Sequence, residues 1–244
     1  MNRVLAIIQA RMGSNRLPGK VMKDIGGETM LARVVKRTKR AELLDNVVVA
    51  TTVDPRDDVI VNECQRLDVP VCRGKESDVL DRYYQAALLH RSDTIVRITS
   101  DSPLIDPAVV DKIISAFLSE NPDYASNVVE RTYPMGLDTE VMSMSTLKRA
   151  WEEARQAYER VHVTPYIYEN PELFRLLHVK GEADYSHYRW TVDVPEDLAF
   201  VRAVYHGLGN NEFVRWKDVV DLLEKDPSLA EMNQHVRQKA LLEC

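Results

Sequence analysis

Short apolar runs alternate with longer amphipathic segments along the first half of the chain. Runs rich in Val and Ile, too short for helices, predict strands at 4–9, 47–51, 69–72 and 94–99. Apolar residues at helical spacing follow each run and predict helices over 30–35, after Asp54-Pro55, over 79–89 and over 107–118. Four successive strand–helix units predict an α/β fold with a doubly wound, mostly parallel sheet, which binds ligands at the carboxyl ends of its strands.

The second half of the chain has a less regular pattern. Strands are predicted at 123–127, 137–142, 174–179 and 189–192. Helices are predicted at 146–157, after Pro195 and again near the C-terminus. No linker, low-complexity tract or internal repeat separates the two halves, so we expect residues 1–244 to form a single domain.

The composition is that of a globular protein. The chain is 45% hydrophobic and 29% charged, which argues against intrinsic disorder. No apolar run approaches the roughly 18 residues of a membrane span, and the first residues resemble a strand rather than a secretory signal. Cys64, Cys72 and Cys244 show no C-x-x-C spacing, so neither a disulfide framework nor a zinc site is expected. We therefore expect a cytoplasmic protein without a membrane partner.

The net charge of -6 is unevenly distributed. The first 40 residues hold ten Lys or Arg and two acids, so they carry +8, and the remaining 204 residues carry -14. A basic end on an acidic chain indicates a local anion site rather than a surface for nucleic acid. Five of these cations fall on the first predicted helix, where we expect a solvent-exposed face: Arg33, Lys36, Arg37, Lys39 and Arg40.

Three further cations, Arg11, Arg16 and Lys20, lie in the loop after the first predicted strand, among small residues. Small residues let main-chain N–H groups approach an anion closely, and the cations add positive charge there. Five residues separate Gly13 from Gly19, and Val21 follows Lys20, so the spacing fits neither a Walker A loop nor a dinucleotide fingerprint. The pattern favours a phosphate-binding loop of another kind over a surface turn with incidental cations.

Residues 7–20 resemble the signature of the cytidylyltransferases that activate acidic sugars, the acylneuraminate and 3-deoxy-manno-octulosonate (Kdo) enzymes. The closest match is to their relatives in the spore coat polysaccharide biosynthesis protein family. The likeness extends to about residue 205, through 47–52, Arg73-Gly74, 97–104 and 189–193. This resemblance implies a nucleotide-diphospho-sugar transferase-like, three-layer α/β sandwich (GT-A-like) and a homodimer.

The resemblance also implies an activity. The enzyme would transfer CMP from CTP to an acidic sugar, a nonulosonic or octulosonic acid, and release pyrophosphate, in surface polysaccharide biosynthesis. Arg11, Lys20 and Asp101 would be catalytic. Thr99 stands where the Kdo and neuraminate enzymes often have Gln. The residues expected to bind the nucleotide are Ala10, Arg11, Gly13, Ser14, Arg16, Lys20, Thr51, Arg73, Gly74, Asp78, Thr99 and Asp101.

Two aspartates, Asp101 and Asp193, each end a predicted strand and lie two residues before a proline. A carboxylate at that edge of the sheet either caps a turn or binds a ligand. Mg²⁺ takes oxygen ligands and usually shares them with substrate phosphates. In the enzymes that the chain resembles, matching aspartates bind the metal, so Asp101 and Asp193 are predicted to hold Mg²⁺. Glu196 and Asp197 are expected to stabilise the first turn of the next helix.

The second half supplies the candidates for acceptor binding, Asn127, Asp138, Glu140 and His162. His162 belongs to a motif like one in the spore coat relatives, which usually have an acid where this chain has Val161. A lone His is more often structural, so His162 is either a structural residue or an acceptor ligand. Glu140, on an alternating strand, is equally compatible with plain solvent exposure and with acceptor binding.

Three other functions fit parts of the pattern. One is nucleotidyl transfer with another nucleotide, or with a phosphonate or sugar-phosphate acceptor. Another is a glycosyltransferase that uses a nucleotide sugar on the same kind of fold, since fold alone does not settle function. A third is a non-catalytic nucleotide sensor. The cationic loop argues against the glycosyltransferase, whose donor has no triphosphate, and the two aspartates argue against the sensor.

Overall fold

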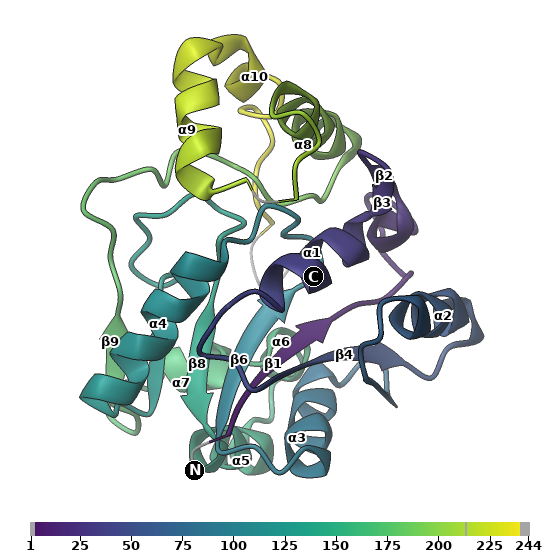
Figure 1. The fold of residues 1–244 in the computed structure, drawn as a ribbon. Helices are drawn as coiled ribbons and strands as arrows, with labels where there is room; N and C mark the ends of the chain where they lie inside the picture. Colours follow the sequence, from purple (N-terminus) through teal and green to yellow (C-terminus); the bar gives the residue numbers. More distant parts are fainter. Residues whose placement is uncertain (1–2, 213, 240–244) are drawn as a thin grey trace.

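A seven-stranded sheet forms the centre of the molecule in the computed structural model, which describes residues 3–212 and 214–239 (Figure 1). Four neighbouring strands are parallel, in the order β5 (Val71–Gly74), β4 (Asn46–Thr52), β1 (Val4–Gln9) and β6 (Thr94–Thr99). Strand β8 (Glu140–Ser143) is antiparallel to β6 and to β7 (Tyr124–Ser126), and β9 (Leu176–His178) pairs in parallel with β7. The predicted doubly wound, mostly parallel sheet is confirmed.

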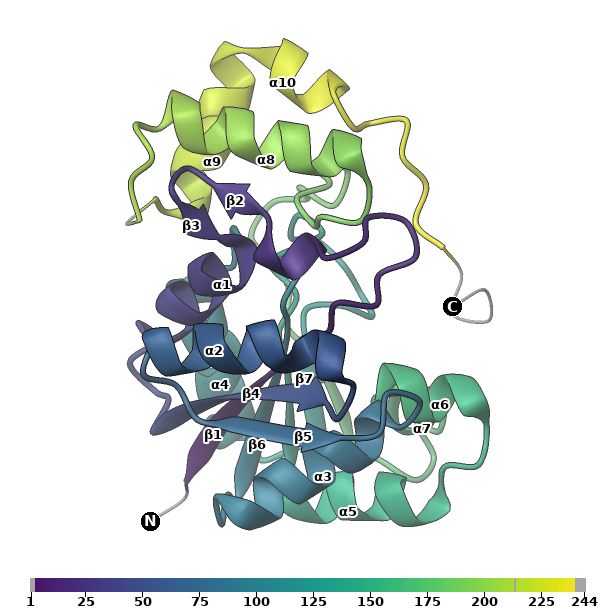
Figure 2. The same ribbon diagram turned by 90° about the vertical axis from the view of Figure 1, so that its right-hand side faces the viewer.

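Helices cover both faces of this sheet (Figures 1 and 2). One face packs against α1 (Met30–Thr38), α2 (Asp58–Arg66) and α4 (Pro107–Glu120). The other face packs against α3 (Val79–Leu89), α5 (Met144–Glu153) and α7 (Pro165–Tyr168), and α6 (Ala157–His162) packs on α3. Side chains alternate along a strand, so Ile8 contributes to the first apolar cluster and Ile7 to the second. The result is the three-layer sandwich that the resemblance implied.

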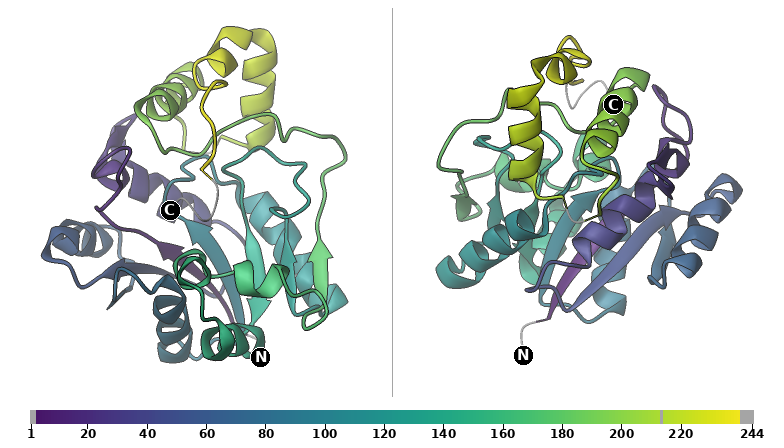
Figure 3. Two further views of the ribbon diagram at one scale, coloured as in Figure 1. Left: turned by 180° about the vertical axis from the view of Figure 1, so that it is seen from behind. Right: turned by 45° about the horizontal axis from the view of Figure 1, so that its top comes forward.

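A group of helices and a short hairpin lies beyond the carboxyl ends of the parallel strands (Figure 3) and encloses a third apolar cluster. It is built by α8 (Pro195–Gly207), α9 (Trp216–Lys225), α10 (Pro227–Glu231) and a short hairpin of β2 (Asp24–Ile25) and β3 (Glu28–Thr29). Leu17, from the loop after β1, and the fully buried Trp190 belong to the same cluster. The third apolar cluster therefore brings the loop after β1 next to the segment around Trp190.

Several predicted boundaries move in the structure. Strand β5 starts at Val71 rather than Val69, because the N–H of Val69 bonds to the carbonyl of Cys64 at the end of α2. The predicted helix over 146–157 starts earlier, after the cap Ser143, and ends at Glu153, before the separate helix α6. Helix α4 continues past the predicted 118 to Glu120, and the left-handed Asn121 ends it.

The strand predicted at 189–192 is wrong. The N–H of Trp190 donates to Met135, and the N–H of Val192 donates to the carbonyl of Asp101 at 2.8 Å. The segment therefore pairs with two separate loops, and only an isolated bridge joins Met135 to Arg189.

The expectation of a wholly solvent-exposed basic face on α1 is also wrong. Arg33 and Arg37 are 3% and 2% exposed. Arg33 donates to the carbonyls of Ile25 and Gly26 in the hairpin turn. Arg37 donates to carbonyls at Ile105, Glu212 and Val214. These two guanidinium groups do not face water. They hydrogen-bond helix α1 to the hairpin and to the chain segment before α9, both of which belong to the third apolar cluster.

Candidate active site

Main-chain hydrogen bonds close the loop that follows β1, residues 10–20. The carbonyl of Met12 accepts from the N–H groups of Ser14 at 2.9 Å and of Gly19 at 3.1 Å. Gly19 has a φ of 66°, in the left-handed region that glycine adopts without strain. Loop 10–20 thus folds back on itself and leads Lys20 into the short 3-10 turn η1 (Lys20–Met22).

A buried carboxylate, Asp57, ties loop 10–20 to the end of β4. One of its oxygens accepts the N–H of Met12 at 2.8 Å. The other accepts from the hydroxyl of Thr51 at 3.0 Å and from the N–H and hydroxyl of Thr52 at 3.1 and 2.6 Å. Asp57 is 1% exposed and Thr51 is fully buried. In this structure Thr51, predicted to bind nucleotide, supports the loop through Asp57.

Lys20 brings the two predicted metal ligands together. Its Nζ donates to Asp101 Oδ2 at 2.8 Å and to Asp193 Oδ1 at 2.9 Å. A third bond, of 2.7 Å, goes to the carbonyl of Val192. The two carboxylate oxygens therefore lie no farther apart than the sum of their distances to Nζ, although 92 positions separate them in the sequence. Their predicted proximity is confirmed.

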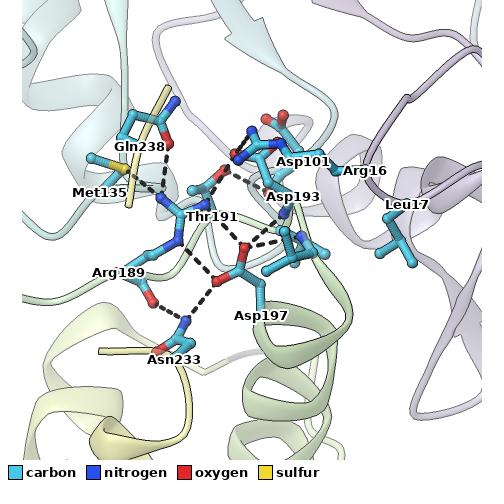
Figure 4. A network of polar contacts seen from close by, with 12 residues as sticks. Arg16, Leu17, Asp101, Met135, Arg189, Thr191, Asp193, Asp197, Asn233 and Gln238 are labelled. Carbon is cyan, nitrogen blue, oxygen red and sulfur yellow. Dashed lines mark hydrogen bonds and ion pairs between the residues drawn. The ribbon is translucent and has the colours of Figure 1, made fainter. Parts of the chain in front are cut away.

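Two arginines complete the surroundings of Asp193 (Figure 4). Arg16, from loop 10–20, contacts Asp193 Oδ2 at 2.9 Å, and Arg189 contacts the same oxygen at 3.0 Å. The side chains of Asp101 and Arg16 are 26% and 25% exposed, so the cluster is open to solvent on one side. Ligand oxygens can reach it from that side.

Asp197 anchors Arg189 from behind (Figure 4). It is 0% exposed and accepts from Arg189 Nε at 2.9 Å and from a terminal nitrogen of Arg189 at 3.0 Å. It also accepts the N–H groups of Asp193 and Val194, so it does stabilise the start of α8 as expected. Asn233 donates to both Asp197 and the carbonyl of Arg189. Asp197 therefore orients the main chain and the arginine that position Asp193.

The charges in this cluster shift each other's titration. Burial acts to lower the pKa of Lys20, but the carboxylates of Asp101 and Asp193 outweigh it and hold that pKa above the ordinary 10.5. Burial likewise acts to raise the pKa of Asp101, and the ammonium of Lys20 outweighs it and holds that pKa below the ordinary 3.8. At neutral pH Lys20 carries a positive charge and Asp101 a negative one.

The donor set fits a hard cation that completes its shell elsewhere. Asp101, Asp193 and the carbonyl of Val192 offer three oxygens around one point, which Lys20 Nζ occupies. Among the described residues no group of three or more His, Cys, Asp or Glu side chains could hold a metal. Mg²⁺ commonly uses one or two carboxylates together with substrate phosphates and water. The residues present therefore suit Mg²⁺ bound jointly with a phosphorylated substrate.

The remaining residues predicted on the loop, Arg11, Gly13, Ser14 and Ala10, differ in their surroundings. Arg11 is exposed and pairs with Glu76 at 2.9 Å. A Cβ on Gly13 would come within 2.8 Å of Glu76 Oε1, so a larger residue there would displace that side chain. Ser14 Oγ accepts the N–H of Leu17 at 3.3 Å, and Ala10 is buried at the end of β1.

The two nucleotide-binding candidates on β5, Arg73 and Gly74, make mostly structural contacts in this structure. Arg73 donates to the carbonyls of Thr52 and Asp54 and pairs with Asp58. Gly74 leaves room for Arg82, whose Cγ would lie 2.7 Å from an added Cβ.

Asp78 caps α3 and holds Arg160 of α6 through two bonds of 3.0 and 2.7 Å. The Thr99 hydroxyl lies 3.2 Å from the Ser102 hydroxyl, and the Thr99 side chain helps to hold the pKa of Asp101 below the ordinary 3.8. Among Arg73, Gly74, Asp78 and Thr99, it is therefore Thr99 that acts on the Lys20 cluster.

The four acceptor candidates occupy different environments. Asn127 is fully buried and bridges to Leu137 and Thr139, which braces the loop before β8. Glu140 is buried too, which excludes the reading of a merely exposed strand residue. Its carboxylate is bonded by Arg97 and by the Tyr124 hydroxyl.

Asp138 pairs with Arg131 and keeps its side chain 26% exposed. His162 is partly exposed at the end of α6. Val163, which follows it, has φ 76° and ψ -54°, and the N–H of Thr164 donates to the carbonyl of His162 at 2.9 Å. This γ-turn is strained for a β-branched residue, and strain of this kind concentrates at functional sites.

Residues 5–228 match the sequence pattern of the cytidylyltransferase family. This chain belongs to that family. An uncharacterized protein of Methanocaldococcus jannaschii is 38% identical over 99% of this chain and 98% of its own length. The spore coat polysaccharide biosynthesis protein SpsF of Bacillus subtilis is 32% identical over 94% of this chain and 98% of its own. A cytidylyltransferase from Leptospira borgpetersenii superposes with a TM-score of 0.91 at 33% identity, over 98% of this chain and all of the other.

Pattern analysis of this cytidylyltransferase missed Asp57, Arg189 and the full role of Asp197. Asp57 follows Asp54-Pro55, where a helix cap was the simpler reading, and Arg189 stood within a segment predicted as a strand. Asn233 and Gln238, which both bond Arg189, lie beyond the span that matches the family. The spacing of Arg189, four residues before Asp193 and eight before Asp197, does not by itself indicate a site. It becomes informative only when the structure shows that both carboxylates bond to this arginine.

Proposed function

We propose that this cytidylyltransferase transfers CMP from CTP to an acidic sugar, a nonulosonic or octulosonic acid, in surface polysaccharide biosynthesis. The observation that carries the proposal is the convergence of Lys20 with Asp101 and Asp193 at the mouth of loop 10–20. Cations for a triphosphate and carboxylates for its metal thus meet at one point. The residue-level resemblance to the acylneuraminate and Kdo enzymes supports the acceptor class, and the likeness to SpsF supports the pathway.

The phosphates of CTP would lie along loop 10–20. Arg11 is exposed and pairs with Glu76, and Arg16 and Lys20 lie next to the aspartates. Contacts between charged groups are each worth about 1.5–3 kcal/mol, so three cations hold the β- and γ-phosphates firmly. They also stabilise the charge that develops on pyrophosphate as it leaves.

Asp101 and Asp193 would hold Mg²⁺, which when bound neutralises charge on the α-phosphate. Asp197 and Arg189 keep Asp193 oriented toward that point. An acceptor hydroxyl oxygen attacks the α-phosphorus in line, the new oxygen–phosphorus bond forms, and the bond to the β-phosphate bridging oxygen breaks. The acceptor proton leaves to solvent or to a nearby carboxylate. Positioning and electrostatics supply most of the rate in such reactions.

The acceptor would lie on the second-half side of the cluster. Asp138 and His162 retain partly exposed side chains and are the acceptor candidates we favour. The family resemblance also suggests a homodimer, and the composition and cysteine spacing suggest a cytoplasmic location. In the described part of the chain, no helix is long and apolar enough to cross a membrane.

Pyrophosphate release measured for each of four nucleoside triphosphates against an acceptor panel tests this proposal. The panel holds nonulosonic acids, octulosonic acids, phosphonates and sugar phosphates. We expect release with CTP, Mg²⁺ and an acidic sugar. Release with another nucleotide only, or transfer of sugar from a nucleotide sugar without pyrophosphate, would replace the proposal with the corresponding alternative.

A further inference from the structure

The ammonium of Lys20 fills the place between the two metal-binding carboxylates. Its three hydrogen bonds, to Asp101, Asp193 and the Val192 carbonyl, have lengths of 2.8, 2.9 and 2.7 Å. A –NH₃⁺ group has three donors, so its hydrogen-bonding capacity is fully used. The side chain is 11% exposed, and the two carboxylates have no room between them for a second cation while Lys20 stays.

The cluster is also balanced in charge. Each carboxylate in it is matched by a cation at 3.0 Å or less. The members are Lys20, Arg16 and Arg189 with Asp101, Asp193 and Asp197. A divalent cation that entered without other changes would leave an excess charge of two in a partly buried place, which is unfavourable.

We propose that Lys20 closes the Asp101–Asp193 site to divalent cations in the free protein, and that a bound triphosphate opens it. This inference rests on the proposed function, since it needs a triphosphate on loop 10–20. The phosphates offer Lys20 and Arg16 new anionic partners, and both side chains belong to the loop itself. Once Lys20 turns to the phosphates, the three oxygens that it bonded, from Asp101, Asp193 and the Val192 carbonyl, are free to bind the metal. The phosphates then supply the remaining ligands.

Two consequences follow from the shared oxygens. Metal and nucleotide must bind with positive coupling, and the coupling must be the same whichever binds first. The protein also selects the metal–triphosphate complex over the free metal, so Lys20 determines specificity in addition to contacting phosphate. No free metal is stored at the site between turnovers.

Mn²⁺ titration followed by electron paramagnetic resonance, which reports the free ion, measures this coupling without turnover. The wild type is titrated alone and with a non-hydrolysable α,β-methylene analogue of CTP. Because the analogue itself binds Mn²⁺ in solution, a titration of the analogue without protein gives that contribution. We expect Mn²⁺ to bind at least about tenfold tighter than the protein-alone and analogue-alone titrations together account for, within the usual range of coupling. Lys20→Met should bind Mn²⁺ at least about tenfold tighter than wild type without nucleotide, and adding Asp101→Asn should remove that gain.

Lys36→Met is the matched control. Lys36 also bridges two carboxylates, Glu28 and Glu212, each at 2.7 Å, but lies on α1 outside loop 10–20. Its removal should leave Mn²⁺ binding at the wild-type level. An equal gain in both variants would mean that any exposed carboxylate pair suffices, and would overturn the proposal.

Other outcomes are equally decisive. No gain in a folded Lys20→Met protein overturns the proposal. If circular dichroism shows that this variant does not fold, the test rests on the wild type alone. Its Mn²⁺ affinity is then measured with the α,β-methylene analogue of each of the four nucleoside triphosphates, and an affinity unchanged by all four overturns the proposal. Coupling with an analogue other than that of CTP supports the role of Lys20 and instead overturns CTP as the nucleotide of the proposed function.

Discussion

The carboxylate of Asp57 accepts the main-chain N–H of Met12 at 2.8 Å, across 45 positions of sequence. Its second oxygen is held by three donors from Thr51 and Thr52 at the end of β4. A single buried side chain thus sets where loop 10–20 begins relative to the sheet. The geometry of the loop depends on a residue outside it.

Asp57→Asn tests this dependence. An amide in place of the carboxylate turns an N–H₂ group toward donors, so at least one buried hydrogen bond to a charged group is lost. We expect a loss of about 2–3 kcal/mol in the free energy of unfolding, measured by urea denaturation, and weaker CTP binding in calorimetry. Asp54→Asn, at the partly exposed cap three residues earlier, should leave both measurements nearly unchanged, because Asn caps a turn about as well as Asp. A stable variant with normal CTP affinity would contradict the supporting role of Asp57.

Arg11→Ala probes the outer side of loop 10–20 with little cost to the fold, because the side chain is 43% exposed. Calorimetric titration should show about 10- to 100-fold weaker binding of CTP, the loss expected for one charge-assisted contact, and a smaller change for CMP. Arg56→Ala is the control, since Arg56 is exposed and paired with a carboxylate in the same way. Equal weakening for CTP and CMP would place Arg11 away from the β- and γ-phosphates.

Asp101→Asn and Asp193→Asn should act as one unit on the Mg²⁺ dependence of turnover. Each should reduce the Mg²⁺-supported rate by about 100-fold or more, and the double variant should add less than about tenfold, because either loss disables a shared site. Rates against Mg²⁺ concentration measure this. Multiplicative effects would separate the two residues.

A sound control for that series is Asp226→Asn, on exposed residue 226 before α10. Asp106 is unsuitable although it caps α4, because its second oxygen accepts the N–H of Trp216 at 2.8 Å. An amide there would disturb the packing of α9 as well as the cap.

The ion pair of Lys20 and Asp101 should give stability a defined pH range. The folded pKa of Asp101 is depressed, so its contribution is present above the ordinary 3.8 and is lost as the pH falls through the lower folded value. The folded pKa of Lys20 is raised, so its contribution is present below 10.5 and is lost as the pH rises through the higher folded value. Urea unfolding of wild type and Asp101→Asn should therefore differ most between these limits, and the difference should shrink below pH 3.8. A difference that grows toward acid would reverse the assignment.

The sequence alone determined the features that depend on local pattern. The strands at 4–9 and 94–99 and the helix over 79–89 agree with the structure to the residue, because their apolar periodicity and flanking polar residues are local signals. The loop chemistry was visible for the same reason, since Arg11, Arg16, Lys20 and two glycines lie within ten positions. Asp101 could be placed at the carboxyl ends of the parallel strands because it follows β6, whereas Asp193 lies there through the pairing of residues 189–192 with two loops and not as the end of a strand.

Tertiary structure alone decided which polar groups meet across the chain. Arg33 and Arg37 look like surface cations in a basic helix. In the structure both are buried, and carbonyls from the β2–β3 turn and from the segment after α8 accept their hydrogen bonds. Residues 189–192 look like a strand, yet Asp101, in the loop after β6, accepts from the Val192 N–H and the Thr191 hydroxyl, and Met135, in the loop before β8, accepts from the Trp190 N–H. Glu140 lies opposite Arg97 only through the pairing of β6 with β8. Such partners are far apart in sequence, and the cost of burying an unpaired charge, which selects them, leaves no periodic trace in the chain.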